Sequence, residues 1–456
     1  MKSEQAVVTL REWEISRPDV GAPLAHYGLS DAARKVAKQL TEAGTLEVLE
    51  LARGLEIRAS SFVGRLTLGQ VTITVQPKLS GAPFINLLRY AYGLRHLDLH
   101  EPVEYATEKW AFQDLLVQQL AAEVAELLAR GVHREYNRTS TDLESPRGRI
   151  EFGRLARMTR WTGAELPCIH YPRSDNTLLN QVVLGGLAHA RQVTSDVDLR
   201  AQLTRLIKTL SQTVSLKKLS ILVLNEARQT IDRRTTAYEP ALVIIQLLLE
   251  AEGVSLDGER GRVRLPGFLF DMNRFFQALI SRFLHDHLAG CEIEDEYRLK
   301  ELFYYDPRLN PRRLRPPVLR PDFVIRRNQR TAAILDAKYR DLWENPLPRE
   351  MLYQLALYAL GQGGDDRKSI IVYPTTDINA SDQVIILREP RSGDLQARVI
   401  LRPLNLLTLE LLLRSRDPQT IREREILARQ LPFGRAKQNA SASRQYISAA
   451  AAQLDG

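Results

Sequence analysis

The chain has 456 residues, of which 44% are hydrophobic and 26% charged. This is the composition of an ordinary globular protein, and it excludes a collagen-like, wholly disordered or disulfide-stapled chain. The 63 Lys and Arg residues outnumber the 55 Asp and Glu residues, and the formal charge of +8 favours polyanionic partners. A single hydrophobic core stops growing at about 250–300 residues, so this length predicts several domains.

Two cysteines, Cys168 and Cys291, lie far apart and form no CxxC pair, so we expect neither a disulfide framework nor a structural zinc site. The N-terminus lacks the apolar segment of a signal peptide, and no apolar run reaches the roughly 18 residues that a membrane span needs. We therefore expect a cytoplasmic protein that does not bind a membrane.

Residues 1–82 are predicted to form a β-rich N-terminal unit. Short β-like runs occupy residues 7–10 and 55–58, and residues 65–75 alternate between polar and apolar side chains. The alternation is broken at Gly69, as expected for a hairpin.

Residues 83–254 are predicted to form a mostly helical middle region, because their apolar residues recur with the period of a helix. The clearest amphipathic stretches lie at residues 112–128, 177–193 and 199–214.

A polar segment at residues 136–154 interrupts this helical region, and we predict an exposed loop that leads into a short strand. Its Arg147 and Arg149 are candidate contacts for phosphates or for a partner, since guanidinium groups suit bidentate contacts with anions. A solvated loop with charge pairs to Asp142 or Glu144 is the alternative.

Residues 255–411 are predicted to form a compact α/β domain, and residues 412–456 a C-terminal extension that is disordered from about residue 435. The fold class is therefore α+β and multidomain. The α/β domain should contain a helix at residues 271–284, paired strands at 321–327 and 332–339, a helix at 349–360, and strands near 370–373 and 399–401.

The candidate catalytic residues lie in the predicted strand pair. Asp322 begins the first strand, and Asp336 and Lys338 end the second. Side chains alternate between the faces of a strand, so Asp336 and Lys338 project to one side, and Asp322 reaches them from the neighbouring strand. The hairpin therefore brings together two carboxylates and an ammonium group.

This trio suits phosphodiester hydrolysis. Asp322 and Asp336 offer oxygen ligands for Mg²⁺, or for Mn²⁺ in its place, and the metal would activate the attacking water. Lys338 would position that water and offset charge on the phosphate. A structural ion pair between Asp336 and Lys338 is the alternative, but a carboxylate directly after a buried apolar run is costly unless it is paired or binds a metal.

Gln354 and Tyr358 lie four residues apart on one face of the helix that follows. Taken alone, this pair indicates a tyrosine ring that packs in the core while its hydroxyl group forms a hydrogen bond. Together with the preceding hairpin, however, it resembles the PD-(D/E)xK nuclease superfamily, in the branch with a QxxxY helix that includes RecB-like enzymes and McrC.

Segments of the N-terminal half are similar to the McrC family in the same order. They lie at residues 64–78, 145–150 and 171–180. The resemblance implies that the trio is catalytic, with its two acids as metal ligands, and that Gln354 and Tyr358 support the site or contact DNA.

The resemblance further implies a hexameric AAA+ GTPase of the McrB type as partner and double-stranded DNA as substrate. It also implies that the N-terminal unit, residues 1–82, docks on this partner. The sequence contains no phosphate-binding loop, so we expect this chain to bind no nucleotide itself. Gln277 departs from the family pattern, which usually has a glutamate there as a further acid of the active site. The affinity for metal and the number of metal ions bound are therefore open.

Four arginines lead into the Asp322 strand and are candidates for contacts with the DNA backbone. They are Arg312, Arg313, Arg315 and Arg320.

We expect a Mg²⁺-dependent endonuclease subunit of a modification-dependent restriction system. A nuclease-inactive adaptor that only activates the AAA+ partner, and a RecB-like repair exonuclease, are the alternatives.

Overall fold

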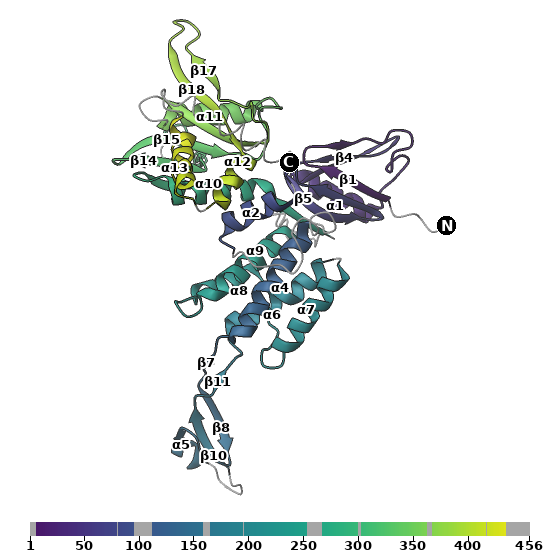
Figure 1. Cartoon of the computed structure of the whole chain (residues 1–456), viewed down its shortest axis with the longest axis vertical. Coiled ribbons are helices and arrows are strands. Elements are labelled where there is room, and N and C mark those ends of the chain that lie inside the picture. The colour runs from purple at the N-terminus through teal and green to yellow at the C-terminus, as the bar shows by residue number, and fades with distance from the viewer. Residues whose placement is uncertain are drawn as a thin grey trace.

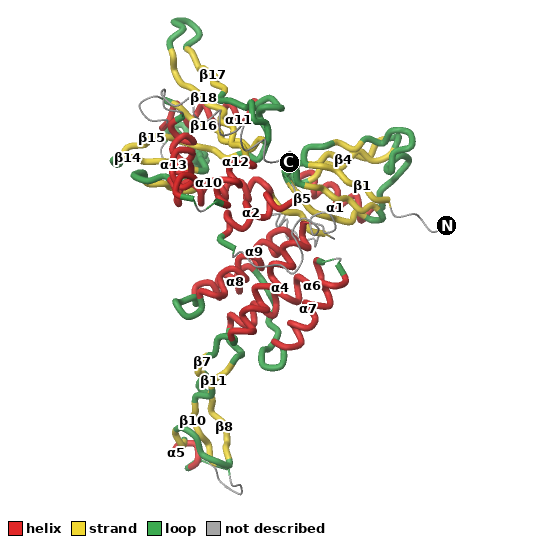
Figure 2. Tube along the Cα trace, in the orientation of Figure 1, coloured by secondary structure: helices red, strands yellow, loops and turns green. Residues whose placement is uncertain are grey.

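The computed structural model describes residues 6–79, 81–94, 112–157, 165–194, 196–252, 267–299, 302–362, 367–415 and 417–434. These residues form a mixed α and β structure with several sheets. The molecule is elongated (Figure 1): a β-rich N-terminal unit and a C-terminal sheet domain lie side by side at one end, a helical body follows, and a β-arm projects from the other end. Figure 2 shows helices concentrated in the middle and strands at both extremities.

The N-terminal unit is β-rich, as predicted. Its predicted strands at residues 7–10 and 55–58 are β1 and β4, and the predicted hairpin is β5–β6, which turns at Gly69 with a φ of 65°. The elements are β1 (Ala6–Arg11), β2 (Ile15–Ser16), α1 (Asp31–Glu42), β3 (Leu46–Leu51), β4 (Gly54–Ala59), β5 (Phe62–Leu68) and β6 (Val71–Gln76).

One sheet of this unit contains a strand from much later in the chain. Its order is β1-β6-β5-β12, and β12 (Gly267–Asp271) pairs antiparallel with β5. The two backbones approach so closely that a Cβ on Gly64 would lie 2.2 Å from the carbonyl oxygen of Phe268, and Gly64 has a φ of 138°. Only glycine fits here without strain. Leu269 of β12 completes the core of the N-terminal unit.

The middle region is helical, and two of the helices predicted from periodicity are confirmed as α4 and α6. The third begins two residues before and ends four residues before the predicted span. Thr177, Asp196 and Ser220 cap the starts of α6, α7 and α8 by accepting backbone N–H groups. The helices are α2 (Gly81–Tyr92), α4 (Phe112–Arg130), α6 (Leu178–Val193), α7 (Val197–Leu210), α8 (Ile221–Gln229) and α9 (Glu239–Glu252).

The exposed loop predicted at residues 136–154 is wrong in part, because this segment forms strands of a β-arm that points away from the helical body (Figure 1). The central strand, β10, pairs with β8 on one side and β9 on the other. Four successive polar residues, 139–142, occupy β8, so no alternation of polarity marks this strand. The arm consists of β7 (Glu135–Tyr136), β8 (Thr139–Leu143), β9 (Arg149–Ile150), α5 (Phe152–Leu155), β10 (Leu166–His170) and β11 (Arg173–Ser174).

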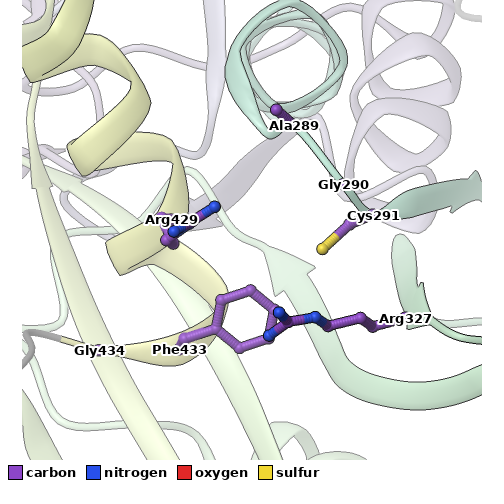
Figure 3. Close-up of a pocket in the computed structure, with 7 residues that line it drawn as sticks. All are labelled: Ala289, Gly290, Cys291, Arg327, Arg429, Phe433 and Gly434. Atoms are coloured by element: carbon purple, nitrogen blue, oxygen red, sulfur yellow. The ribbon is translucent and has the colours of Figure 1, made fainter.

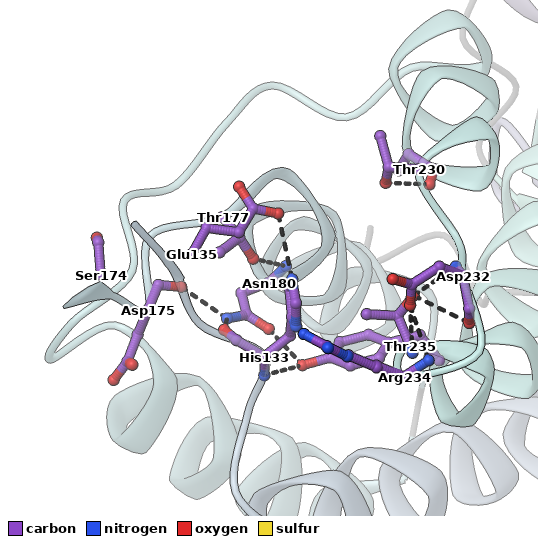
Figure 4. A network of polar contacts seen from close by, with 12 residues as sticks. His133, Glu135, Ser174, Asp175, Thr177, Asn180, Thr230, Asp232, Arg234 and Thr235 are labelled. Atoms are coloured by element: carbon purple, nitrogen blue, oxygen red, sulfur yellow. Dashed lines mark hydrogen bonds and ion pairs between the residues drawn. The ribbon is translucent and has the colours of Figure 1, made fainter. Parts of the chain in front are cut away.

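A network of hydrogen bonds fastens the arm to the helical body at its root (Figure 4). The amide of Asn180 on α6 donates to the backbone oxygens of His133 and Asp175. These two residues lie on the two segments that connect the arm to the helical body. The hydroxyl of Tyr238 donates to the Asn180 carbonyl and accepts the His133 N–H. Both connecting segments are therefore fixed to the helical body.

The C-terminal domain contains the predicted helices and strands around a six-stranded sheet of order β13-β14-β15-β16-β18-β17. Strands β15, β16 and β18 are parallel, and the other pairings are antiparallel. The elements are α10 (Met272–His287), β13 (Glu292–Asp295), β14 (Phe323–Arg327), β15 (Arg330–Ala337), α11 (Arg349–Gln362), β16 (Lys368–Thr375), β17 (Gln383–Arg388), β18 (Leu395–Asn405), α12 (Leu406–Arg414) and α13 (Pro418–Phe433).

The core of the helical body continues into the C-terminal domain. One cluster of buried residues runs from α4, α6 and α9 through α10 to one face of β14 and β15, and α11 covers a second cluster that includes Val324 and Ile334. The predicted extension after residue 411 contains the last residues of α12 and all of α13, whose Ala428 and Leu431 are buried in the first cluster. Residues 435–456 lie outside the described part of the chain, and the domain boundaries at residues 82, 254 and 411 stay predictions.

Candidate active site

The hairpin brings the two predicted acids together. Strands β14 and β15 pair with Phe323 opposite Leu335, so the next residues along this register are Asp322 and Asp336. The side chain of Asp336 is 2% exposed, and Oδ2 of Asp322 accepts the backbone N–H of Ala337 at 2.8 Å. Two carboxylates therefore lie side by side at the buried end of the sheet.

Lys338 follows the last residue of β15 and faces the same site. Its backbone N–H donates to the carbonyl oxygen of Val372 on the neighbouring strand at 3.0 Å, which fixes its place beside the sheet. Its Nζ lies 3.2 Å from Oδ2 of Asp336. This contact is an ion pair without hydrogen-bond geometry, and Oδ2 of Asp336 is buried without a hydrogen-bond donor.

The electrostatics of the trio follow from this crowding. Burial, followed by the charge of Asp336, raises the pKa of Asp322 to about 7. Burial lowers the pKa of Lys338, but the carboxylates of Asp336 and Asp322 raise it by more, so its pKa ends above the ordinary value. Lys338 is therefore a cation at neutral pH in the metal-free protein.

This donor set fits Mg²⁺. Asp336 has a buried carboxylate oxygen that lacks a donor, and ionised Asp322 beside it needs a compensating positive charge. Mg²⁺ typically takes one or two carboxylates and completes its shell with water and substrate phosphates. No group of three or more His, Cys, Asp or Glu side chains able to hold a metal occurs within the described residues, so the protein itself offers two acids.

Gln277 on α10 reaches the site and contacts Asp322. Its Nε2 donates to Oδ1 of Asp322 at 3.2 Å. A glutamate in this place would add a third negative charge, whereas the neutral amide stabilises the ionised form of Asp322.

Gln354 and Tyr358 lie on α11, which covers the sheet near the trio. Nε2 of Gln354 donates to the Tyr358 hydroxyl at 2.6 Å, and Tyr358 is fully buried. Burial and then the charge of Asp336 raise the Tyr358 pKa, and its hydroxyl faces the backbone N–H of Arg320. The pair therefore supports the strand that carries Asp322, whereas its predicted role in contacting DNA stays a prediction.

The four arginines predicted to contact DNA are all exposed in the segment between β13 and β14. Arg320 lies 3.7 Å from Glu296, and Arg312, Arg313 and Arg315 precede it in the same segment. These arginines precede Asp322 in the sequence, and their role as DNA contacts stays a prediction.

Arg147 and Arg149 lie elsewhere, on the exposed surface of the β-arm. The alternative ion pair with Asp142 is not formed in the described residues, because Asp142 pairs with Arg154 at 3.1 Å. Gly148 has a φ of 75°, and a Cβ there would lie 2.3 Å from the carbonyl oxygen of Ile169, so glycine holds the two arginines on a tight turn against β10.

Two residues near the site were not found from the sequence. Asn273 accepts the backbone N–H of Tyr339 at 3.1 Å, directly after Lys338. Its position four residues before Gln277, on the same helix face, was the available signal. Glu12 is 2% exposed and faces the hydroxyl of Tyr339 and the backbone of Lys78, a long-range contact that no local pattern indicates.

A separate pocket lies at the other end of β14 from Asp322 (Figure 3). It has a volume of about 320 Å³, and none of the predicted site residues lines it. Its lining residues are Ala289, Gly290, Cys291, Arg327, Arg429, Phe433 and Gly434.

The sequence of this chain shows which protein family it belongs to. Residues 57–374 match the family described as McrBC 5-methylcytosine restriction system component. The chain belongs to this family. No curated protein matches the sequence significantly, and no helix in the described residues is long and apolar enough to cross a membrane.

Two solved structures resemble the chain. The first is a half-complex from a tetradecameric assembly of Thermococcus gammatolerans McrB AAA+ hexamers with bound McrC; the match has 18% identity, a TM-score of 0.59, and covers 92% of this chain and 99% of that one. The second is the McrBC complex of the same organism, with 19% identity, a TM-score of 0.43, and coverage of 62% and 88%. The first likeness shows a shared fold.

We predict that Gln277→Glu lowers the Mg²⁺ concentration at which half of the metal sites are filled, by about 10-fold, because a third carboxylate beside Asp322 adds on the order of 1–2 kcal/mol of attraction. Isothermal titration with Mg²⁺ measures this change. Gln383→Glu, at an exposed position on the edge strand β17, is the control. Equal affinities in wild type and Gln277→Glu would mean that residue 277 lies outside the metal shell.

We predict that Glu12→Gln changes how stability depends on pH. Burial raises the Glu12 pKa to about 8, so stability from its neutral form is complete below about pH 4.5 and is lost as pH rises through 8. The variant avoids this loss, and its free energy of unfolding at pH 9 should exceed that of wild type by roughly 2–4 kcal/mol.

Urea denaturation at pH 5, 7 and 9 measures this difference, with Glu14→Gln as the matched control because Glu14 is exposed two residues away. A constant difference between wild type and Glu12→Gln at all three pH values would contradict the prediction.

Proposed function

We propose that this chain is the Mg²⁺-dependent DNA endonuclease subunit of its restriction system. The observation that carries the proposal is the convergence of Asp322, Asp336 and Lys338 at the buried end of one hairpin. Lys338 lies 3.2 Å from an Asp336 oxygen that has no hydrogen-bond donor. A purely structural ion pair would leave the neighbouring carboxylate of Asp322 without a cation of its own, which is costly in a buried site.

Each residue has a separate task in the proposed reaction. Asp322 and Asp336 would hold the metal, which when bound supplies a Lewis acid for the scissile phosphate. Lys338 stays protonated, so its ammonium group can donate to the attacking water and to a phosphate oxygen on which negative charge increases. Gln277 orients the carboxylate of Asp322 through the contact at 3.2 Å.

The proposed substrate is double-stranded DNA. The exposed segment with Arg312, Arg313 and Arg315 precedes Asp322 in the chain, and positive charge beside the site would hold the backbone without reading its sequence. The net charge of +8 favours the same partner.

The proposed protein partner is a hexameric AAA+ GTPase of the McrB type. The structure that this chain resembles in fold contains McrC bound to McrB AAA+ hexamers. The sequence lacks a phosphate-binding loop, so GTP hydrolysis would belong to the partner. The β-arm is the proposed contact, because it projects from the body and carries exposed Arg147 and Arg149 (Figure 1).

We predict that Lys338→Ala lowers the rate of DNA cleavage by at least about 100-fold, since it removes the only cation held against the two acids in the described site. The chain is incubated with a AAA+ GTPase of the McrB type, GTP, Mg²⁺ and methylated or unmethylated plasmid. Cleavage and GTP turnover are recorded together.

GTP turnover should stay at the wild-type level in Lys338→Ala, which serves as the control for folding and assembly. Lys368→Ala, at the start of β16, controls for the loss of a lysine from the same domain. Cleavage that persists in Lys338→Ala would contradict the proposal. A wild-type chain that stimulates GTP turnover but never cuts would instead be an adaptor.

We predict that the double change Arg147→Ser and Arg149→Ser lowers the stimulation of the partner GTPase by roughly 10-fold, because two exposed charge contacts together contribute on the order of 1–2 kcal/mol. The control removes the same charge from exposed positions on α7, through Arg205→Ser and Lys208→Ser. An equal loss of GTPase stimulation in both double variants would show that the stimulation depends on net charge rather than on the β-arm.

A further inference from the structure

The backbone leaves the sheet at the residue after Lys338. The N–H of Lys338 still pairs with Val372 on β16, but its carbonyl oxygen accepts the N–H of Arg340 in a tight turn. The N–H of Tyr339 between them cannot pair within the sheet. A buried backbone donor needs another partner, and Oδ1 of Asn273 accepts it at 3.1 Å.

Asn273 uses the other end of its amide to contact the N-terminal unit. Its Nδ2 donates to Oγ of Ser61 at 2.6 Å, in the connection between β4 and β5. Ser61 is 3% exposed, and its carbonyl oxygen accepts the N–H of Met272 at 2.9 Å. One side chain thus bridges the N-terminal unit and the backbone beside Lys338.

Other contacts join the same two regions. The ring of Tyr339 is buried edge-to-face against Phe276, and its hydroxyl faces Glu12 of the N-terminal unit. The guanidinium of Arg340 lies 5.3 Å from the centre of the Trp13 ring. In the same segment, Glu344 pairs with Lys78 at 3.4 Å.

The helix that carries Asn273 also holds the other side of the site. Gln277 lies one turn further along α10 and contacts Asp322. Residues four apart share a helix face, so one rigid face of α10 sets both the carboxylate of Asp322 and the backbone of Lys338. This arrangement fixes the ammonium group relative to the two acids.

We propose that Asn273 is a positioning residue of the nuclease site: it ties the backbone that carries Lys338 to the N-terminal unit, which thereby becomes a structural part of the cleavage centre. The inference rests on the nuclease function proposed above. It assigns the N-terminal unit a task in cleavage besides any docking on a partner.

The test compares Asn273→Leu, which has similar size but no polar atoms, with Asn273→Asp. Asp keeps an oxygen for the N–H of Tyr339, and the Ser61 hydroxyl can turn to donate to its second oxygen. The control on the same helix is Ser281→Ala, which removes a contact with Asp295 on β13. All variants are made in the full chain and assayed with the AAA+ partner.

Deuterium uptake over residues 338–341, without metal or DNA, should rise in Asn273→Leu and stay at the wild-type level in Asn273→Asp and Ser281→Ala. In cleavage assays, kcat of Asn273→Leu should fall by about 10- to 100-fold, with KM for DNA and GTPase stimulation little changed. Asn273→Asp should recover most of the loss. This split between kcat and KM distinguishes positioning from general destabilisation.

Unchanged uptake in Asn273→Leu overturns the inference, and so does increased uptake with an unchanged kcat. If wild type does not cut, the proposed function fails, and the uptake comparison alone decides whether Asn273 holds this segment. If Asn273→Leu does not fold, Ser61→Ala replaces it, because this variant removes the bridge but keeps the Tyr339 contact. Wild-type uptake and kcat in Ser61→Ala would then overturn the inference.

Discussion

Two like charges held together in a buried place are the constraint on which the site depends. Asp322 and Asp336 face each other at the end of the β14–β15 hairpin, and water is too scarce there to screen them. Lys338 offsets one of the charges, and the neutral amide of Gln277 avoids adding a third. The surrounding helices and the N-terminal unit hold these groups against their mutual repulsion.

The parts of the fold that were predicted correctly are those determined by nearby residues. The β5–β6 hairpin follows from alternation and a glycine turn, and α4 and α6 follow from helical periodicity. The trio could be predicted because antiparallel pairing across a short turn places Asp322 opposite Asp336. Local rules of this kind depend little on the rest of the chain.

The parts that could not be predicted depend on distant contacts. Strand β8 of the β-arm is polar on both faces, so it becomes recognisable only through its pairing with β10. Asn273 lies 66 residues from its partner Tyr339, and Glu12 lies in another unit altogether. Such contacts arise only when the tertiary fold is complete. The spacing of Asn273 and Gln277 indicates a shared helix face, but no local pattern indicates the partner of Asn273.

The pairing of β12 with β5 has a consequence for synthesis of the chain. The edge of β5 that pairs with β12 has no partner until a strand that begins roughly 200 residues later is synthesised. At about 5–20 residues per second, translation leaves this edge open for roughly 10–40 seconds. An open β-edge can pair with other chains, so nascent molecules are exposed to aggregation during this interval. The N-terminal sheet can thus be completed only after the ribosome has synthesised the residues of the helical body.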